Sequence, residues 1–196
     1  LENILHKNIQ NINLIGSGRT DSGVHALGQV ANIKLSTAMS AIDLKNAINA
    51  NINRDIFIKD SIEVGLDFNS RFLAKKRCYI YKINRIYTPF ANNREWFNNT
   101  MFDVELLKKC SRLILGVHDF SLLSKANSEI DNKTCEIYSS EWNRIENKLI
   151  YKIEGNRFLH HMVRYLVGTM MEVAKNNISI NDFRKLLDNN SNSRKI

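Results

Sequence analysis

The pattern of apolar and polar positions predicts strands and helices that follow one another along the chain. Strands are favoured where apolar residues form short runs or alternate, at residues 12–15, 31–35, 54–64, 77–87, 134–145 and 148–154. The last two regions flank Glu146 and Asn147 and therefore predict a hairpin. In the fourth region, Tyr79, Tyr81 and Ile83 are expected on one face of the strand.

Apolar residues three or four positions apart predict the helices. One helix is expected to begin near Ser40, and a second to follow Asp103 as its N-cap and close at Gly116. A third is expected from about Phe158 to Lys175, and the last contains Phe183, Leu186 and Leu187. Leu1, Ile4 and Leu5 also have helical spacing without a preceding cap, and the polar tail after Leu187 has no closing element. Both ends of the chain are therefore expected to be cut. Helices interspersed with paired strands predict an α+β fold with antiparallel sheets.

Composition and charge narrow the class of protein. The 196 residues are 43% hydrophobic and 24% charged, which is typical of a globular protein with one or two domains. No apolar run is long enough for a membrane span, and the first residues do not resemble a signal peptide. The three cysteines form no CxxC motif and are expected to be reduced thiols in the cytoplasm. A net charge of +8 favours a polyanionic partner, most simply a nucleic acid.

The stretch GSGRTDSGVHALGQV, residues 16–30, is the first candidate for chemistry. It fails as a dinucleotide loop because Asp21 stands at the third glycine position, and it lacks the Lys and Ser/Thr of a P-loop. Asp21 and His25 are only two ligands, which is weak support for a metal site. Two interpretations stay open. Either Asp21 caps a short helix and the glycines form the turn, or Asp21 is a reacting carboxylate and Arg19 contacts a phosphate or a base.

The helix expected at 158–175 is apolar around most of its circumference, so we expect it to be buried. Arg164 lies in its middle and needs either a carboxylate partner or a path to solvent. The sharper hypothesis is that Arg164 pairs with Asp21 and keeps that carboxylate ionised. His160 and His161 are adjacent, so they are not expected to face one site together; they are interpreted as packing or RNA-facing residues rather than as ligands.

A basic run precedes Tyr79, and such a combination suits nucleic acid. An aromatic ring can stack on a base while neighbouring cations contact phosphates. The cations expected to do so are Arg71, Lys75, Lys76 and Arg77. The alternative is that Tyr79 and Tyr81 form an aromatic pair in the core, and we assign this core role to Tyr81.

Four blocks of sequence together resemble one known family. GSGRTDSGVHALGQVANI, RFLAKKRCYIYKI, GVHDFSLLSK and FLHHMVRYLVGTMMEV resemble, in this order, the motifs of the tRNA pseudouridine synthase A family, and the resemblance extends from about Leu1 to Leu187. It implies two related α+β halves with antiparallel sheets, flanking helices and a central cleft. Residues 1–68 would form the half that carries the aspartate loop, and residues 69–196 the half that completes the cleft. The family's first and last strands are absent, so both halves are expected to be partial.

The resemblance implies an isomerase that uses neither a cofactor nor a metal ion. Members convert uridine to pseudouridine at positions 38, 39 and 40 of the tRNA anticodon stem-loop. They break the N1–C1′ bond, rotate the uracil and join C5 to C1′. The implied partners are tRNA and a second copy of the chain, with no membrane, and the implied location is the cytoplasm.

The matching positions imply the roles of individual residues. Asp21 aligns with the catalytic aspartate, the nucleophile, which attacks either the uracil ring or C1′ of the ribose. Arg19 aligns with the arginine that helps to extrude the target nucleotide. Tyr79 aligns with the tyrosine that stacks on the uracil and assists removal of the C5 proton, and Arg164 aligns with the basic partner of the aspartate. His160 is added to the basic residues above as a substrate-binding residue.

Two other classes of function are retained as alternatives. A tRNA-binding or folding-assistance protein, with little turnover because of truncation, would share the basic surface but would not need Asp21. A metal-dependent nuclease would need clustered acidic residues, which the sequence does not show.

Overall fold

The computed structural model describes residues 13–125 and 131–188, which form two compact units. The first unit contains the residues up to Thr20 and residues 26–74, and the second contains residues 21–25 and the chain from Lys75 onward. The short segment 21–25 therefore belongs to the second unit, although both of its flanks belong to the first. The helix expected at Leu1–Leu5 and the start of the first predicted strand lie outside the described residues.

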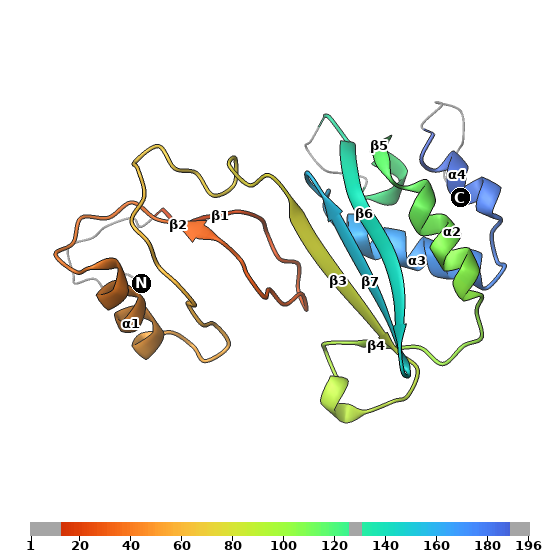
Figure 1. Cartoon of the computed structure of the whole chain (residues 1–196), viewed down its shortest axis with the longest axis horizontal. Coiled ribbons are helices and arrows are strands. Elements are labelled where there is room, and N and C mark those ends of the chain that lie inside the picture. Colours follow the sequence, from red (N-terminus) through yellow and green to blue (C-terminus); the bar gives the residue numbers. More distant parts are fainter. Residues whose placement is uncertain (1–12, 126–130, 189–196) are drawn as a thin grey trace. The chain divides into compact units, whose positions relative to one another are not determined.

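The described part of the first unit contains one helix and a small sheet. Helix α1, Ala41–Asn51, begins as predicted after Ser40, whose hydroxyl accepts the backbone N–H of Asp43 at 3.2 Å. Strand β1, Ile15–Gly16, pairs antiparallel with β2, Ala31–Asn32, and both are shorter than predicted (Figure 1). The buried Ser70 holds them, since its hydroxyl donates to the Ile15 carbonyl at 2.7 Å and its N–H donates to the Asn32 side chain at 2.9 Å.

The strand predicted at 54–64 is wrong, because this segment has no strand partner among the described residues. The side chain of Asn49 takes the place of a neighbouring strand. Its amide donates to the carbonyl of Ile58 at 2.9 Å, and its oxygen accepts the N–H of Ile58 at 2.8 Å. The alternation of apolar residues there therefore gave a false strand signal, and Ile56, Phe57 and Ile62 are exposed.

The second unit is built on a five-stranded sheet with the order β4-β3-β7-β6-β5. Its strands are β3 (Arg77–Asn84), β4 (Trp96–Phe97), β5 (Gly116–Asp119), β6 (Thr134–Ile145) and β7 (Lys148–Gly155). The β6–β7 hairpin is confirmed, with a left-handed Glu146 in its turn. All pairings are antiparallel except that of the two-residue β4 with β3, which is parallel.

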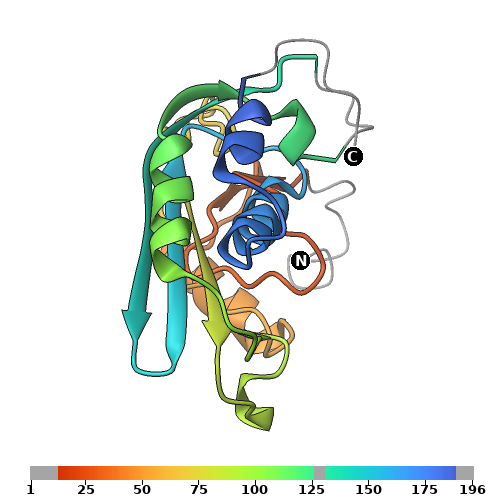
Figure 2. The same ribbon diagram turned by 90° about the vertical axis from the view of Figure 1, so that its right-hand side faces the viewer.

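Helices α2 (Val104–Leu113), α3 (Met162–Ala174) and α4 (Ile180–Lys185) lie on one face of this sheet (Figures 1 and 2). Two short 3-10 turns, Pro89–Ala91 and Ser121–Leu123, complete the unit. As predicted, Tyr79, Tyr81 and Ile83 share the covered face of β3. Helix α3 begins at Met162, four positions later than predicted from Phe158.

A bulge in β6 changes which residues face the helices. Cys135 and Ile137 are buried before it, whereas Ser140 and Trp142 are buried after it, because the register with β7 shifts between Ile137 and Ser139. The extra residue, Tyr138, is exposed. A strict two-residue period therefore does not describe this strand.

Two large side chains in the core of the second unit, Tyr151 and Trp142, have partners for their polar atoms. Tyr151 is fully buried, its hydroxyl lies 2.9 Å from the Ser140 hydroxyl, and burial raises its pKa. Trp142 stacks on Tyr151 with ring centroids 4.7 Å apart, and its indole N–H donates to the sulfur of Met170 at 3.4 Å. The face of α3 that packs on the sheet is thereby fixed in rotation.

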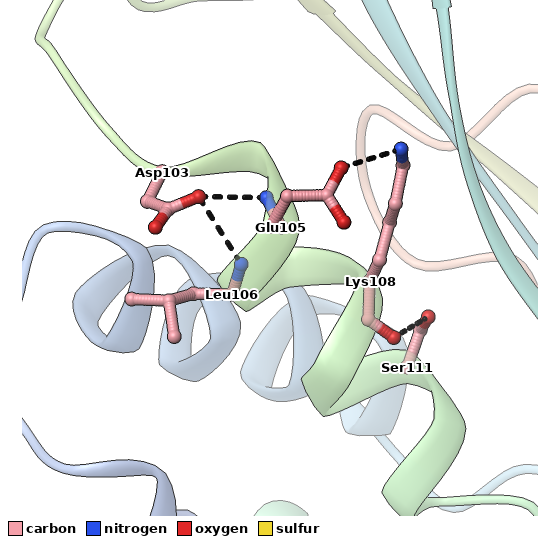
Figure 3. A network of polar contacts seen from close by, with 5 residues as sticks. All are labelled: Asp103, Glu105, Leu106, Lys108 and Ser111. Atoms are coloured by element: carbon pink, nitrogen blue, oxygen red, sulfur yellow. Dashed lines mark hydrogen bonds and ion pairs between the residues drawn. The ribbon is translucent and has the colours of Figure 1, made fainter.

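The start of α2 confirms the predicted cap. The Asp103 carboxylate accepts the N–H groups of Glu105 at 2.8 Å and Leu106 at 3.4 Å (Figure 3). Further along the helix, Glu105 pairs with Lys108 at 2.8 Å, and the Ser111 hydroxyl donates to the Lys108 carbonyl at 2.9 Å. The helix ends before Gly116, which has a positive φ of 92° and starts β5 instead of closing the helix.

The α+β class predicted from the pattern is confirmed by two sheets and interspersed helices. Within residues 13–125 and 131–188, no helix combines the length and the apolar character that a bilayer crossing requires.

Candidate functional site

Asp21 begins a tight turn that belongs to the second unit. The N–H of Val24 donates to the Asp21 carbonyl at 3.0 Å, and Gly23 has a φ of 78°, the value that the third residue of a type II turn requires. Any other residue at position 23 would be strained. No helix starts directly after Asp21, because the next helix, α1, begins only at Ala41, so the Asp21 carboxylate is not a helix cap. The glycine thus forms the turn, and the carboxylate stays available for other contacts.

Arg164 holds this turn by its main chain. Its Nη2 donates to the carbonyl of Ser22 at 2.8 Å. Of the two readings of Arg164, the structure shows the path to solvent: Arg164, Tyr165 and Gly168 form the exposed side of α3, while Leu166, Met170 and their neighbours pack on the sheet. Among the ion pairs of the described residues, none joins Arg164 to Asp21. The guanidinium therefore anchors the loop that carries the carboxylate rather than the carboxylate itself.

Two imidazoles take the position next to the carboxylate instead. His160 Nε2 lies 3.3 Å from one Asp21 oxygen, and His161 Nε2 lies 3.5 Å from the other. The expectation that adjacent histidines cannot face one site together is wrong here. His161 has φ 62° and ψ 3°, a left-handed conformation that sends its side chain to the same side as that of His160. The two ring centroids are 4.0 Å apart.

Hydrogen bonds fix the turn that carries the two histidines. The N–H of Met162 donates to the Leu159 carbonyl at 3.1 Å, and the N–H of Lys125 donates to the His160 carbonyl at 3.0 Å. A left-handed residue other than glycine costs about 1–3 kcal/mol. Residues that keep such a conformation cluster at functional sites, so the geometry of His161 supports a site at this position.

Tyr79 lies at the covered face of β3 and is half-buried. Its ring meets the ring of Phe158 edge-on, with centroids 5.0 Å apart and an interplanar angle of 78°. Burial raises the pKa of Tyr79 above its ordinary value of 10.0, the charge of Asp21 raises it further, and Arg77 lowers it. The phenol therefore carries its proton at neutral pH. The neighbouring Tyr81 is also half-buried, and burial raises its pKa as well.

The basic residues predicted to contact phosphates differ in their environments. Lys75 is exposed, Lys76 pairs with Glu154 at 3.1 Å, and Arg77 donates to the Asn156 carbonyl at 2.8 Å. Arg19 and Arg71 are exposed and belong to the first unit. The second unit thus brings Asp21, Tyr79, Arg164, His160 and His161 together. His161 and Phe158 are the two members that sequence reasoning did not select.

Sequence comparisons agree with the geometry. Residues 111–196 match the family described as tRNA pseudouridine synthase. The chain is 32% identical over 180 residues to the tRNA pseudouridine synthase A of Chlorobium chlorochromatii, which covers 92% of this chain and 74% of that protein. It is 37% identical to the protein of the same name from Bacillus sp. strain KSM-64, over 89% of this chain and 72% of that one.

A third relative covers more of both sequences. The tRNA pseudouridine synthase A of Dictyoglomus thermophilum is 38% identical over 189 residues, which is 94% of this chain and 77% of that protein. The shared region includes the Asp21 turn and both histidines, since nearly the whole chain is aligned. Identity at this level over such a length establishes common descent, and the chain belongs to the tRNA pseudouridine synthase A family.

Proposed function

We propose that the chain converts uridine to pseudouridine in tRNA, at positions 38, 39 and 40 of the anticodon stem-loop, as a cytoplasmic homodimer. The observation that carries the proposal is the Asp21 carboxylate on its anchored turn, in a member of this family. Its side chain is 25% exposed, so a substrate can reach it. The net charge of +8 supports a polyanionic substrate.

The reaction rearranges bonds without any change in composition. Asp21 acts as the nucleophile, at C1′ of the ribose or on the uracil ring, and the N1–C1′ bond breaks. The freed uracil rotates and C5 bonds to C1′. In the ribose route, the bond between the carboxylate and C1′ breaks in that same step; in the ring route, the carboxylate leaves the ring afterwards. The proton then leaves C5, and N1 gains a proton. The nucleotide must first be flipped out of the stem, which costs a few kcal/mol; Arg19 is the proposed residue that takes its place.

The residues around Asp21 have separate roles in this proposal. Arg164 positions the turn through the Ser22 carbonyl, and the two histidines hold the carboxylate oxygens in the free enzyme. Tyr79 receives the flipped base on its ring. The RNA around the flipped base is bound by five basic residues, namely Arg71, Lys75, Lys76, Arg77 and His160. Lys76 and Arg77 would exchange their present protein partners for phosphates when RNA binds.

The test of the function is tritium release from tRNA labelled at C5 of uridine. We expect the full chain to release tritium to water, because the C5–H bond breaks only when the uracil is rejoined through C5. A pseudouridine map of the same tRNA is expected to show positions 38, 39 and 40. Tight tRNA binding without any tritium release would instead support the tRNA-binding alternative.

Two substitutions at Tyr79 separate stacking from proton transfer. Tyr79→Phe keeps the ring, so we expect unchanged tRNA affinity but about 10²–10⁴-fold slower turnover, because the hydroxyl that takes part in moving the C5 proton is gone. Tyr79→Leu removes the ring as well and is expected to weaken binding by about 1–3 kcal/mol. Single-turnover rates and filter-binding affinities measure the two effects. Equal affinities for Leu and Phe would refute the stacking role.

A further inference from the structure

We infer that Asp21, His160 and His161 form a binding site for a borderline transition-metal ion such as Zn²⁺, which acts there as an inhibitor. One carboxylate oxygen lies 3.3 Å from His160 Nε2 and the other lies 3.5 Å from His161 Nε2. One ligand atom from each of the three residues lies within 4.8 Å of the other two.

The two carboxylate–imidazole separations are close to the spacing between two ligands of a tetrahedral ion. Bonds of about 2.0–2.2 Å from Zn²⁺ to nitrogen and oxygen place two ligand atoms about 3.4 Å apart. The distance from His160 Nε2 to one Asp21 oxygen is 3.3 Å and the distance from His161 Nε2 to the other oxygen is 3.5 Å, so each imidazole lies near this spacing from its own oxygen. An ion held by a single oxygen would draw the second imidazole toward that oxygen, starting from ligand atoms that all lie within 4.8 Å of one another. Three protein ligands leave a fourth position for water, as in open zinc sites.

The donor set selects the class of metal. Two imidazole nitrogens and one carboxylate suit Zn²⁺, Co²⁺, Ni²⁺ or Cu²⁺. Mg²⁺ and Ca²⁺ prefer oxygen ligands, and only one carboxylate is present. The Arg164 guanidinium, bound to the carbonyl next to Asp21, adds a positive charge that further disfavours ions held mainly by charge.

The site is both held in place and open to solvent. Main-chain hydrogen bonds fix the His160–His161 turn, and Arg164 fixes the Asp21 turn. The side chains of Asp21, His160 and His161 are 25%, 45% and 33% exposed, so an ion can reach them from solvent. A bound ion would occupy a lone pair on one Asp21 oxygen. Inhibition of turnover rests on the proposed function, whereas metal binding does not.

Cobalt absorption tests the site on the full chain without RNA. We expect the visible bands of tetrahedral Co²⁺ to saturate at one equivalent, Zn²⁺ to displace them, and millimolar Mg²⁺ to leave them unchanged. His160→Gln and the isosteric Asp21→Asn are each expected to weaken Co²⁺ binding by roughly tenfold or more, because each removes one of three ligands. His25→Gln is the matched control, a histidine of the same short segment that lies outside the cluster, and it is expected to bind Co²⁺ as the wild type does.

The outcomes separate this site from the proposed function. Absence of the tetrahedral bands in the wild-type chain overturns the site, and so do bands that persist at full strength in both His160→Gln and Asp21→Asn. Saturable bands in a chain that releases no tritium from tRNA would uphold the site and refute the proposed function. If both hold, Zn²⁺ should stop tritium release, and a chelator should restore it.

Discussion

Asp21→Asn is expected to reduce tritium release from C5-labelled tRNA by at least about three orders of magnitude, because an amide cannot form the bond that the carboxylate forms. The substitution preserves the size and shape of the side chain. The turn is closed by main-chain groups and anchored by Arg164 at the Ser22 carbonyl, and neither contact involves the carboxylate. We therefore expect the thermal midpoint and the tRNA affinity to change little, so that the loss falls on the chemical step.

Asp60→Asn is the matched control for that experiment. Asp60 is an exposed aspartate of the first unit whose carboxylate accepts the N–H of the next residue, Ser61, at 2.9 Å. The Asp60→Asn variant loses the same charge as Asp21→Asn, and it is expected to release tritium at the wild-type rate. If Asp21→Asn keeps more than a tenth of the wild-type rate, Asp21 is not the nucleophile, and the proposed mechanism fails even if the product is pseudouridine.

Gly155→Ala is expected to destabilise the second unit by about 1–3 kcal/mol, the usual cost of overfilling a packed interior. A β-carbon at position 155 would lie 2.7 Å from the main-chain oxygen of Glu136, 3.1 Å from Ile137 Cδ1 and 3.3 Å from Phe158 Cζ. The carbonyl is part of the backbone next to the β6–β7 ladder and cannot move without disturbing it. Relief must come partly from Phe158, on which Tyr79 rests, so turnover is expected to fall as well.

Gly168→Ala is the control: it makes the same chemical change but is expected to raise the free energy of unfolding instead of lowering it. Gly168 lies inside α3 on its exposed side, and an added β-carbon would meet no heavy atom within 4 Å. Alanine is favoured over glycine in a helix by about 0.5–1 kcal/mol, so this variant is expected to be more stable than the wild type. Urea unfolding, followed by the fluorescence of the buried Trp142, measures the stability of both glycine variants. A neutral Gly155→Ala would show that the sheet tolerates the extra methyl group.

Local signals predicted much of the fold because they act over a few residues. Ser40 and Asp103 precede apolar residues at helical spacing, and both side chains cap the helices that follow. The β6–β7 hairpin was also predictable, from two strand patterns around a two-residue turn. The false strand at 54–64 shows the limit of such signals. An alternating segment needs a partner strand, and here the main chain of Ile58 bonds to the side chain of Asn49 instead.

The arrangement of the site was harder to predict, because it depends on two unusual backbone conformations. Nothing in the letters FLHHMVR marks His161 as left-handed, although that conformation brings both imidazoles to Asp21. The exposure of Arg164 could have been predicted, since Tyr165 and Gly168 lie with it on the one narrow side of α3 that is exposed. The hydrogen bond from Arg164 to the Ser22 carbonyl, in place of the Asp21 carboxylate, could not be predicted, because it depends on the type II turn at Gly23.

The assignment of residues 21–25 to the second unit has a consequence for the gene. Asp21, the proposed nucleophile, is encoded inside the stretch that builds the first unit, whereas both histidines, Tyr79 and Arg164 are encoded after Lys75. A break between Ala74 and Lys75 would leave a downstream fragment without the proposed nucleophile, and an upstream fragment that has Asp21 but lacks Arg164, which anchors its turn. On the proposed mechanism, we expect neither fragment alone to turn over tRNA. Restored activity on mixing the two would require the inserted turn to dock again without its covalent link.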